Sequence, residues 1–192
     1  QNKTHYLPHG VSFSLFSSNI CRASDLPDKP LVAGFYGSLS NWLDYSLLEQ
    51  VCRANPHWQF VFIGPIELDK NPLPKLENVH YLGPKAHHEL PRYSQHWNVG
   101  LLPFTENAQI KACNPLKLLE YLSAGCHVIS TPFPAIAQFS EHLHIVNNPK
   151  QFNQALKNLE KQAIRPNSAL DTMQAQSWQA RAAQVSQWLE AL

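Results

Sequence analysis

The residue types best suited to binding chemistry gather in one short segment, residues 114–125. Asn114, Lys117 and Glu120 are spaced three apart, so on a helix they follow one side, away from a stripe of leucines. A cation in the first turn is disfavoured by the helix dipole by about 0.3–1 kcal/mol. Lysine before glutamate is also the weaker order for a helical ion pair. A bound anion at the helix start explains both features, and a carboxylate one turn further can accept two hydrogen bonds from a vicinal diol such as a ribose. A solvated lysine–glutamate face remains the alternative.

Two further loops follow apolar runs. Residues 34–40 run from a strand towards a helix, and their small residues would let the backbone approach a phosphate at a helix start. They match neither GxGxxG nor GxxxxGK[ST], so dinucleotide and P-loop binding are not indicated. The second loop is 83–85, followed by His87, His88 and Glu89, where backbone groups could read a planar base edge. An ordinary turn is the alternative reading of each loop.

Composition excludes several classes of protein. Fifteen Lys and Arg against fourteen Asp and Glu give a net charge of +1, whereas dedicated nucleic-acid binders carry a basic excess. The four cysteines form no CxxC pair and are expected as reduced thiols of a cytoplasmic protein. No HxH or HxxxH pair occurs, and adjacent His87 and His88 point about 100° apart on a helix, so no metal site is expected.

No apolar run approaches the roughly 18 residues of a membrane span, and no signal peptide is recognisable. The chain begins at Gln1 without a methionine, which we interpret as a fragment of a longer protein.

Short apolar runs alternate with amphipathic stretches along the chain. Strands are predicted at 31–36, 60–63, 79–82, 99–102, 128–130 and 144–146. Helices are predicted after a cap at Ser40 or Asn41, at 89–94, and at 115–124 with Gly125 just past its end. Continuously apolar strands alternating with helices predict an α/β fold, a Rossmann-like doubly wound parallel sheet with helices on both faces. We expect one domain over 1–192, with 150–192 as a helical tail whose apolar face ends at Leu192.

In this order, the segments resemble the C-terminal, donor-binding domain of retaining GT-B glycosyltransferases of the group 1, family 4-like type. Residues 78–83 are similar to the family's N-V-x-x-L-G strand, and 99–104 to the strand before its donor loop. The most specific likeness is 115–131, which resembles the block P-x-K-x-x-E-Y-x-A-x-G-x-P-V-I. Residues 7–11 and Ser177-Trp178 are similar to its entry segment and closing helix. The resemblance implies one half of a GT-B fold, with the N-terminal acceptor domain absent from this chain.

The resemblance also implies roles for the residues of the predicted helix. Glu120 would hold the ribose hydroxyls of a nucleoside diphosphate sugar. Asn114 and the helix start at Pro115 and Leu116 would face the diphosphate together with Lys117. Lys117 and Glu120 are the expected catalytic residues, since backbone N–H groups and a lysine can stabilise a departing diphosphate without a metal.

Further contacts and partners follow from the same resemblance. Gly37 and Ser38 would lie beneath the phosphates, while Pro84 and Lys85 would meet the base. The donor would be UDP-, GDP- or dTDP-linked, with no resident cofactor. A glycan or lipid acceptor would be brought by the missing domain, which could also hold the protein peripherally at the inner membrane face.

Two positions depart from the family pattern. Ala112 stands where many members carry a second glutamate, for which Glu106 or Asn107 could substitute. Asn41, Trp42 and Asp44 stand where the family often carries Arg and Lys after its first Gly-rich strand, which leaves Lys111 or Lys117 to neutralise phosphate. These departures keep two alternatives open, a non-catalytic nucleotide-sugar-binding module and half of a nucleotide-sugar epimerase.

Overall fold

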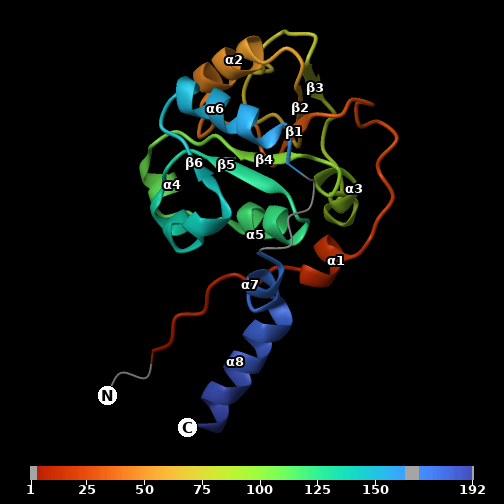
Figure 1. The fold of residues 1–192 in the computed structure, drawn as a ribbon. Helices are drawn as coiled ribbons and strands as arrows, with labels where there is room; N and C mark the ends of the chain where they lie inside the picture. The colour runs from red at the N-terminus through yellow and green to blue at the C-terminus, as the bar shows by residue number, and fades with distance from the viewer. Residues whose placement is uncertain (1–3, 163–168, 192) are drawn as a thin grey trace.

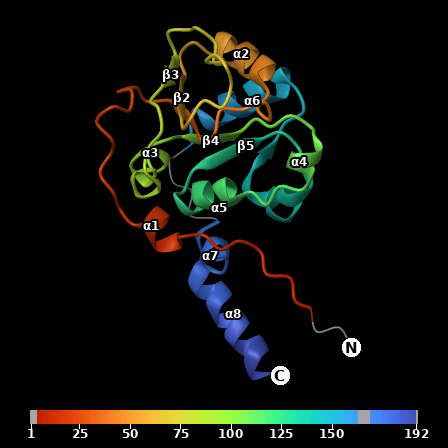
Figure 2. The same ribbon diagram turned by 180° about the vertical axis from the view of Figure 1, so that it is seen from behind.

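The computed structural model describes residues 4–162 and 169–191, and its centre is a six-stranded sheet (Figures 1 and 2). All five strand pairings are parallel, and the strand order is β3-β2-β1-β4-β5-β6. The strands are β1 Val32–Tyr36, β2 Gln59–Ile63, β3 Val79–Tyr81, β4 Val99–Leu102, β5 His127–Ser130 and β6 His144–Ile145. Each lies within one residue of its predicted bounds, so the predicted doubly wound parallel sheet is confirmed.

Helices cover both faces of this sheet, which explains why β1 and β4 bury every residue. On one face, α2 (Tyr45–Ala54) and α6 (Pro149–Leu159) lie side by side (Figure 1). The opposite face carries α5 (Leu116–Ser123), with η1 (His87–Glu89) and α3 (Pro91–Ser94) towards one end of it (Figures 1 and 2). Because the chain leaves β1 in one direction and β4 in the other, the topological switch point lies between these two strands.

The start of α2 corrects one prediction. Neither Ser40 nor Asn41 caps this helix; Asp44 does, and its Oδ1 accepts from the Leu47 N–H at 2.8 Å. The preceding residues are held by bridges to other strand ends, Leu39 to Ile66 and Leu43 to Phe104, so they cannot begin a helix. The loop after β1 therefore does not lead directly into a helix N-terminus, and an acidic side chain occupies the one that follows.

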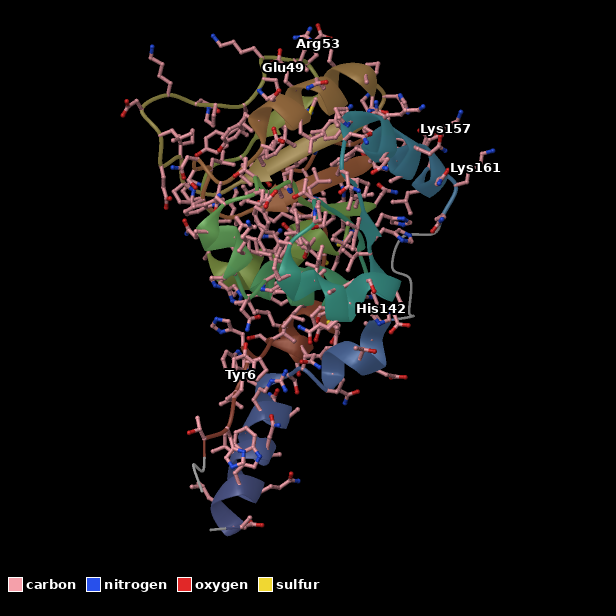
Figure 3. The ribbon with its side chains drawn as sticks, turned by 90° about the vertical axis from the view of Figure 1, so that its left-hand side faces the viewer. Tyr6, Glu49, Arg53, His142, Lys157 and Lys161 are labelled. Atoms are coloured by element: carbon pink, nitrogen blue, oxygen red, sulfur yellow. The ribbon has the colours of Figure 1, made fainter. Side chains whose placement is uncertain are left out.

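The remaining elements surround this frame. They are α1 Phe13–Ser17, α4 Ala108–Lys111, η2 Pro134–His142, α7 Leu170–Gln174 and α8 Trp178–Glu190. Helix α8 projects from the body of the domain beside the N-terminal segment, where Tyr6 lies (Figure 3). None of its side chains is buried, and Leu189 is 64% exposed. Positions 163–168 of the predicted tail, and Leu192, lie outside the described residues.

No helix among residues 4–162 and 169–191 has the length and apolar character needed to cross a membrane.

Candidate functional site

A cavity of about 270 Å³ opens at the carboxyl ends of β1 and β4, the switch point of the sheet. Tyr36, the last residue of β1, lines it from one side, and Leu102 and Phe104 line it from the end of β4. The first turn of α5 and the side chain of His87 complete the wall. Ligands of open α/β sheets bind at this position because the loops that follow two diverging strands leave a crevice between them.

Helix α5 contributes the polar groups of this cavity. Lys117 and Glu120 both line it, as do Asn114, Pro115 and Leu116 just before and at the helix start. The helix is oriented by its apolar side, which is buried against the sheet. Five of the positions predicted from the sequence therefore share one cavity, with Glu120 one helical turn beyond Lys117.

Glu120 is almost fully buried and already has one partner. The Nε2 atom of His87 lies 2.7 Å from Glu120 Oε1, and the His87 side chain is half exposed while that of Glu120 is 5% exposed. His87 belongs to η1, which follows β3, so its contact with Glu120 links that segment to α5. His87 was predicted only to follow the loop 83–85, with no role of its own. One oxygen of the carboxylate remains for a further donor.

Lys117 is half-buried, and burial lowers the pKa of its ammonium group below the usual value, while the nearby Cys113 and Glu120 oppose that shift. Its Nζ lies 5.9 Å from the centre of the Phe35 ring. Among residues 4–162 and 169–191, no carboxylate lies within ion-pairing distance of it. An ammonium that is partly desolvated and lacks an anionic partner favours a bound anion.

Gly37 makes room for this lysine. A Cβ at position 37 would lie 2.2 Å from Lys117 Cε, and the φ of +134° is one that other residues rarely adopt. The loop after β1 therefore acts through the space that Gly37 leaves for Lys117.

The other predicted contacts lie outside this cavity. Ser38 and Pro84 do not line it, and neither does Lys85. Lys85 Nζ instead lies 2.6 Å from Asp25 Oδ2, and this hydrogen bond raises the pKa of Lys85. The Tyr93 hydroxyl donates to the other oxygen of Asp25 at 2.7 Å. The structure thus gives Lys85 an acidic partner from an earlier segment of the chain.

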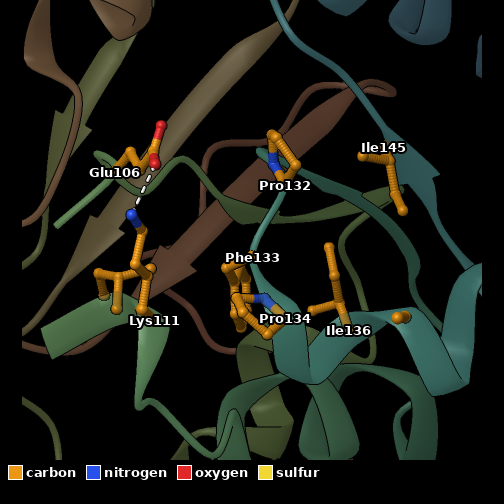
Figure 4. A pocket seen from close by; sticks show the side chains of 9 residues that line it. Glu106, Lys111, Pro132, Phe133, Pro134, Ile136 and Ile145 are labelled. Atoms are coloured by element: carbon orange, nitrogen blue, oxygen red, sulfur yellow. Dashed lines mark ion pairs between the residues drawn. The ribbon is translucent and has the colours of Figure 1, made fainter. Parts of the chain in front are cut away.

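The residues that could replace the glutamate missing at position 112 and the missing basic pair have other partners. Glu106 and Lys111 point towards one another and form an exposed ion pair at 2.8 Å (Figure 4). Asn107 caps α4, its Oδ1 accepting from the Ile110 N–H at 2.8 Å. Of the two lysines considered for phosphate binding, only Lys117 lines the cavity.

The Glu106–Lys111 pair lies at a second hollow of about 520 Å³ (Figure 4). Its wall is otherwise apolar and comes from α4, the loop after β5, η2 and β6. The apolar lining residues are Ile110, Pro132, Phe133, Pro134, Ile136, Ala137 and Ile145. This hollow offers no group suited to a diphosphate apart from the paired Lys111.

Within the described part of the chain, no three His, Cys, Asp or Glu side chains come together in a group that could hold a metal ion.

Comparison with known proteins identifies the family. A family model described as "Glycosyl transferases group 1" matches residues 31–162. "Putative teichuronic acid biosynthesis glycosyltransferase TuaH" of Bacillus subtilis (strain 168) is 29% identical over 152 residues, which cover 73% of this chain and 37% of that protein.

Solved structures agree in fold. Anabaena Alr3699/HepE in complex with UDP and glucose superimposes with a TM-score of 0.70 at 14% identity, over 95% of this chain and 55% of HepE. Sucrose-phosphate synthase from Thermosynechococcus elongatus gives 0.73 at 17% identity, over 96% of this chain and 51% of the synthase. The chain thus spans about half the length of these GT-B proteins. It belongs to the group 1 glycosyltransferase family, and its doubly wound sheet is one half of a GT-B fold.

Proposed function

We propose that this chain is the donor-binding domain of a glycosyltransferase that takes the glycosyl group from a nucleoside diphosphate sugar. The observation that carries the proposal is the convergence of Lys117 and Glu120 on one cavity at the switch point. The first offers an unpaired cation beside a helix N-terminus, and the second a buried carboxylate one turn away. A nucleoside diphosphate presents the complementary groups, two phosphates and a ribose diol.

The proposed chemistry is stabilisation of the leaving group. As the glycosidic bond breaks, negative charge builds on the diphosphate. The Lys117 ammonium and the positive end of the α5 dipole would face that charge in a partly desolvated cavity. Glu120 would accept hydrogen bonds from the ribose hydroxyls and so position the diphosphate next to Lys117. Because these groups supply the positive charge, we propose that transfer needs no metal ion.

We propose a UDP-linked donor, which the solved complexes of HepE support. HepE has been solved with UDP-glucose, and that structure aligns over 95% of this chain. We further propose that the acceptor is a polysaccharide, glycolipid or other cell-surface glycan held by a second domain, and that configuration is retained, as in the family this chain resembles. TuaH is named as a putative glycosyltransferase of teichuronic acid biosynthesis.

Calorimetric titration with UDP, GDP, dTDP and ADP tests the proposal. We expect one nucleotide to bind selectively and Glu120→Ala to weaken its binding by about 1.5–3 kcal/mol, the value of a hydrogen bond to a charged group. Glu49→Ala is the matched control, because Glu49 pairs with Arg53 on the exposed face of α2 (Figure 3) and does not line the cavity. Equal affinity in the wild-type protein and in folded Glu120→Ala would remove the ribose role.

A further inference from the structure

Tyr36 carries a buried polar group that the proposed donor contacts do not use. It is the last residue of β1, its side chain is 3% exposed, and it lines the same cavity as Glu120. Its hydroxyl makes no well-formed hydrogen bond among the described residues, and its polar neighbour in the cavity wall is the Glu120 carboxylate. Buried hydroxyls are rarely left unpaired in native proteins unless a ligand or water completes them, because desolvation without a partner is unfavourable.

Packing prevents the Tyr36 ring from turning towards another partner. The ring of Tyr121 lies 4.8 Å away edge-on, and that of Trp97 lies 5.7 Å away. Both can approach because the strands carry glycine opposite them. A Cβ at Gly34 would lie 2.1 Å from the Trp97 ring, and one at Gly100 would lie 2.6 Å from Tyr121. The backbone N–H of Tyr36 also donates to the Tyr121 hydroxyl at 3.1 Å. The position of the unpaired hydroxyl is therefore fixed by the fold.

The chemistry around this hydroxyl defines what it can bind. Burial raises the pKa of Tyr36 well above its usual value, and the neighbouring Glu120 raises it further, through its charge and as an acceptor close to the hydroxyl, so the hydroxyl stays protonated and can donate. A ligand atom placed between the two side chains must accept from Tyr36 and donate to Glu120. A phosphate oxygen only accepts and is repelled by the carboxylate, whereas a sugar hydroxyl does both.

We propose that Tyr36 is a donor-binding residue whose hydroxyl donates to a ribose hydroxyl that in turn donates to Glu120. The inference rests on the proposed function and deepens it, because it makes the cavity selective for ribonucleotides over their deoxy analogues. A site built to hydrogen-bond a substrate hydroxyl discriminates strongly against a ligand that lacks it. His87 already donates to Glu120 Oε1, so the ligand hydroxyl takes the other oxygen.

The test compares Tyr36→Phe with the wild-type chain in titrations with UDP, 2′-deoxy-UDP and 3′-deoxy-UDP. Loss of one neutral hydrogen bond predicts UDP binding weaker by roughly 3- to 10-fold. The analogue that lacks the hydroxyl bound by Tyr36 should bind the variant almost as tightly as it binds the wild type. The preference for UDP over that analogue should therefore fall by the same factor. Thermal unfolding of the ligand-free variant should occur at the same or a higher temperature, because no well-formed protein hydrogen bond is lost. Tyr45→Phe is the control, since the Tyr45 hydroxyl already donates to the Ser40 carbonyl at 2.9 Å and lies outside the cavity.

The failure of the Tyr36 role can be told apart from the failure of the donor site. If Glu120→Ala loses UDP binding but Tyr36→Phe binds UDP and both analogues as the wild type does, the role of Tyr36 is overturned and the donor site stands. If Tyr36→Phe loses more thermal stability than Tyr45→Phe, its hydroxyl serves the fold and the inference fails. If the wild-type chain binds no nucleoside diphosphate at millimolar concentration, both proposals fail together.

Discussion

Replacement of Lys117 by methionine isolates the proposed phosphate contact. Methionine keeps an unbranched side chain of similar length, so the packing against Gly37 and the Phe35 ring is largely preserved while the charge is removed. The ammonium has no acidic partner among the described residues, so its loss leaves no carboxylate unpaired. Any change in nucleotide binding then reports the lysine itself.

The expected magnitude follows from these surroundings. A hydrogen bond to a charged group contributes about 1.5–3 kcal/mol, which corresponds to a roughly 10- to 150-fold loss of UDP affinity. Uridine carries no phosphate, so its affinity should change by less than about twofold. The ligand-free variant should unfold at a higher temperature, because burial makes the charged form of Lys117 unfavourable and lowers its pKa.

Calorimetric titration of both proteins with UDP and uridine measures the difference. Lys111→Met is the control, because Lys111 is exposed and paired with Glu106 away from the cavity. Equal losses for UDP and uridine, or a UDP affinity that matches the wild type, would refute the assignment of Lys117 to the diphosphate.

Three other expectations can be checked with the same assays. Gly37→Ala should cost about 1–3 kcal/mol in denaturant unfolding, because alanine is strained at a φ of +134°, and it should also weaken UDP binding by displacing Lys117; unchanged affinity in the folded variant would contradict this. Asp44→Ala should lower the free energy of unfolding by about 1 kcal/mol through loss of the α2 cap, yet leave UDP affinity intact; weaker UDP binding would restore the loop after β1 as an anion site. UDP affinity should fall as the pH rises through the lowered pKa of Lys117, with no such fall in Lys117→Met. Below its lowered pKa, the buried charge of Lys117 destabilises the folded wild-type protein. This destabilisation is lost as the pH rises from that pKa to 10.5, the ordinary pKa of lysine, so the difference in free energy of unfolding between the two proteins should narrow with rising pH. A widening difference would contradict the burial effect.

The sheet was predictable because its strands are short, apolar and separated by helical patterns. Buried parallel strands such as β1 and β4 need no alternation, so their runs stand out from the amphipathic stretches around them. The helix after β1 was placed too early because Leu43 continues its apolar spacing. In the structure Leu43 bridges to Phe104 instead, a contact between segments about sixty residues apart that no local pattern contains.

The candidate site also combines features that the local sequence indicates with features that arise from contacts between distant segments. The spacing of Lys117 and Glu120 on one helix is local, and the structure places both in one cavity as the spacing suggested. The partner of Lys85 comes from sixty residues earlier in the chain, and nothing near Lys85 in the sequence indicates it. The unpaired hydroxyl of Tyr36 depends on two glycines and two aromatic side chains drawn from β1, β4, α5 and the residues just before β4. Such a feature exists only once the fold has assembled.

A crystal structure of this chain with the nucleoside diphosphate that binds most tightly tests the central claim most directly. We predict a phosphate oxygen within hydrogen-bonding distance of Lys117 Nζ and a ribose hydroxyl on Glu120, inside the cavity between the ends of β1 and β4. A nucleotide found elsewhere, for example in the apolar hollow beside Lys111, or one bound in the cavity without contact to either side chain, would contradict it.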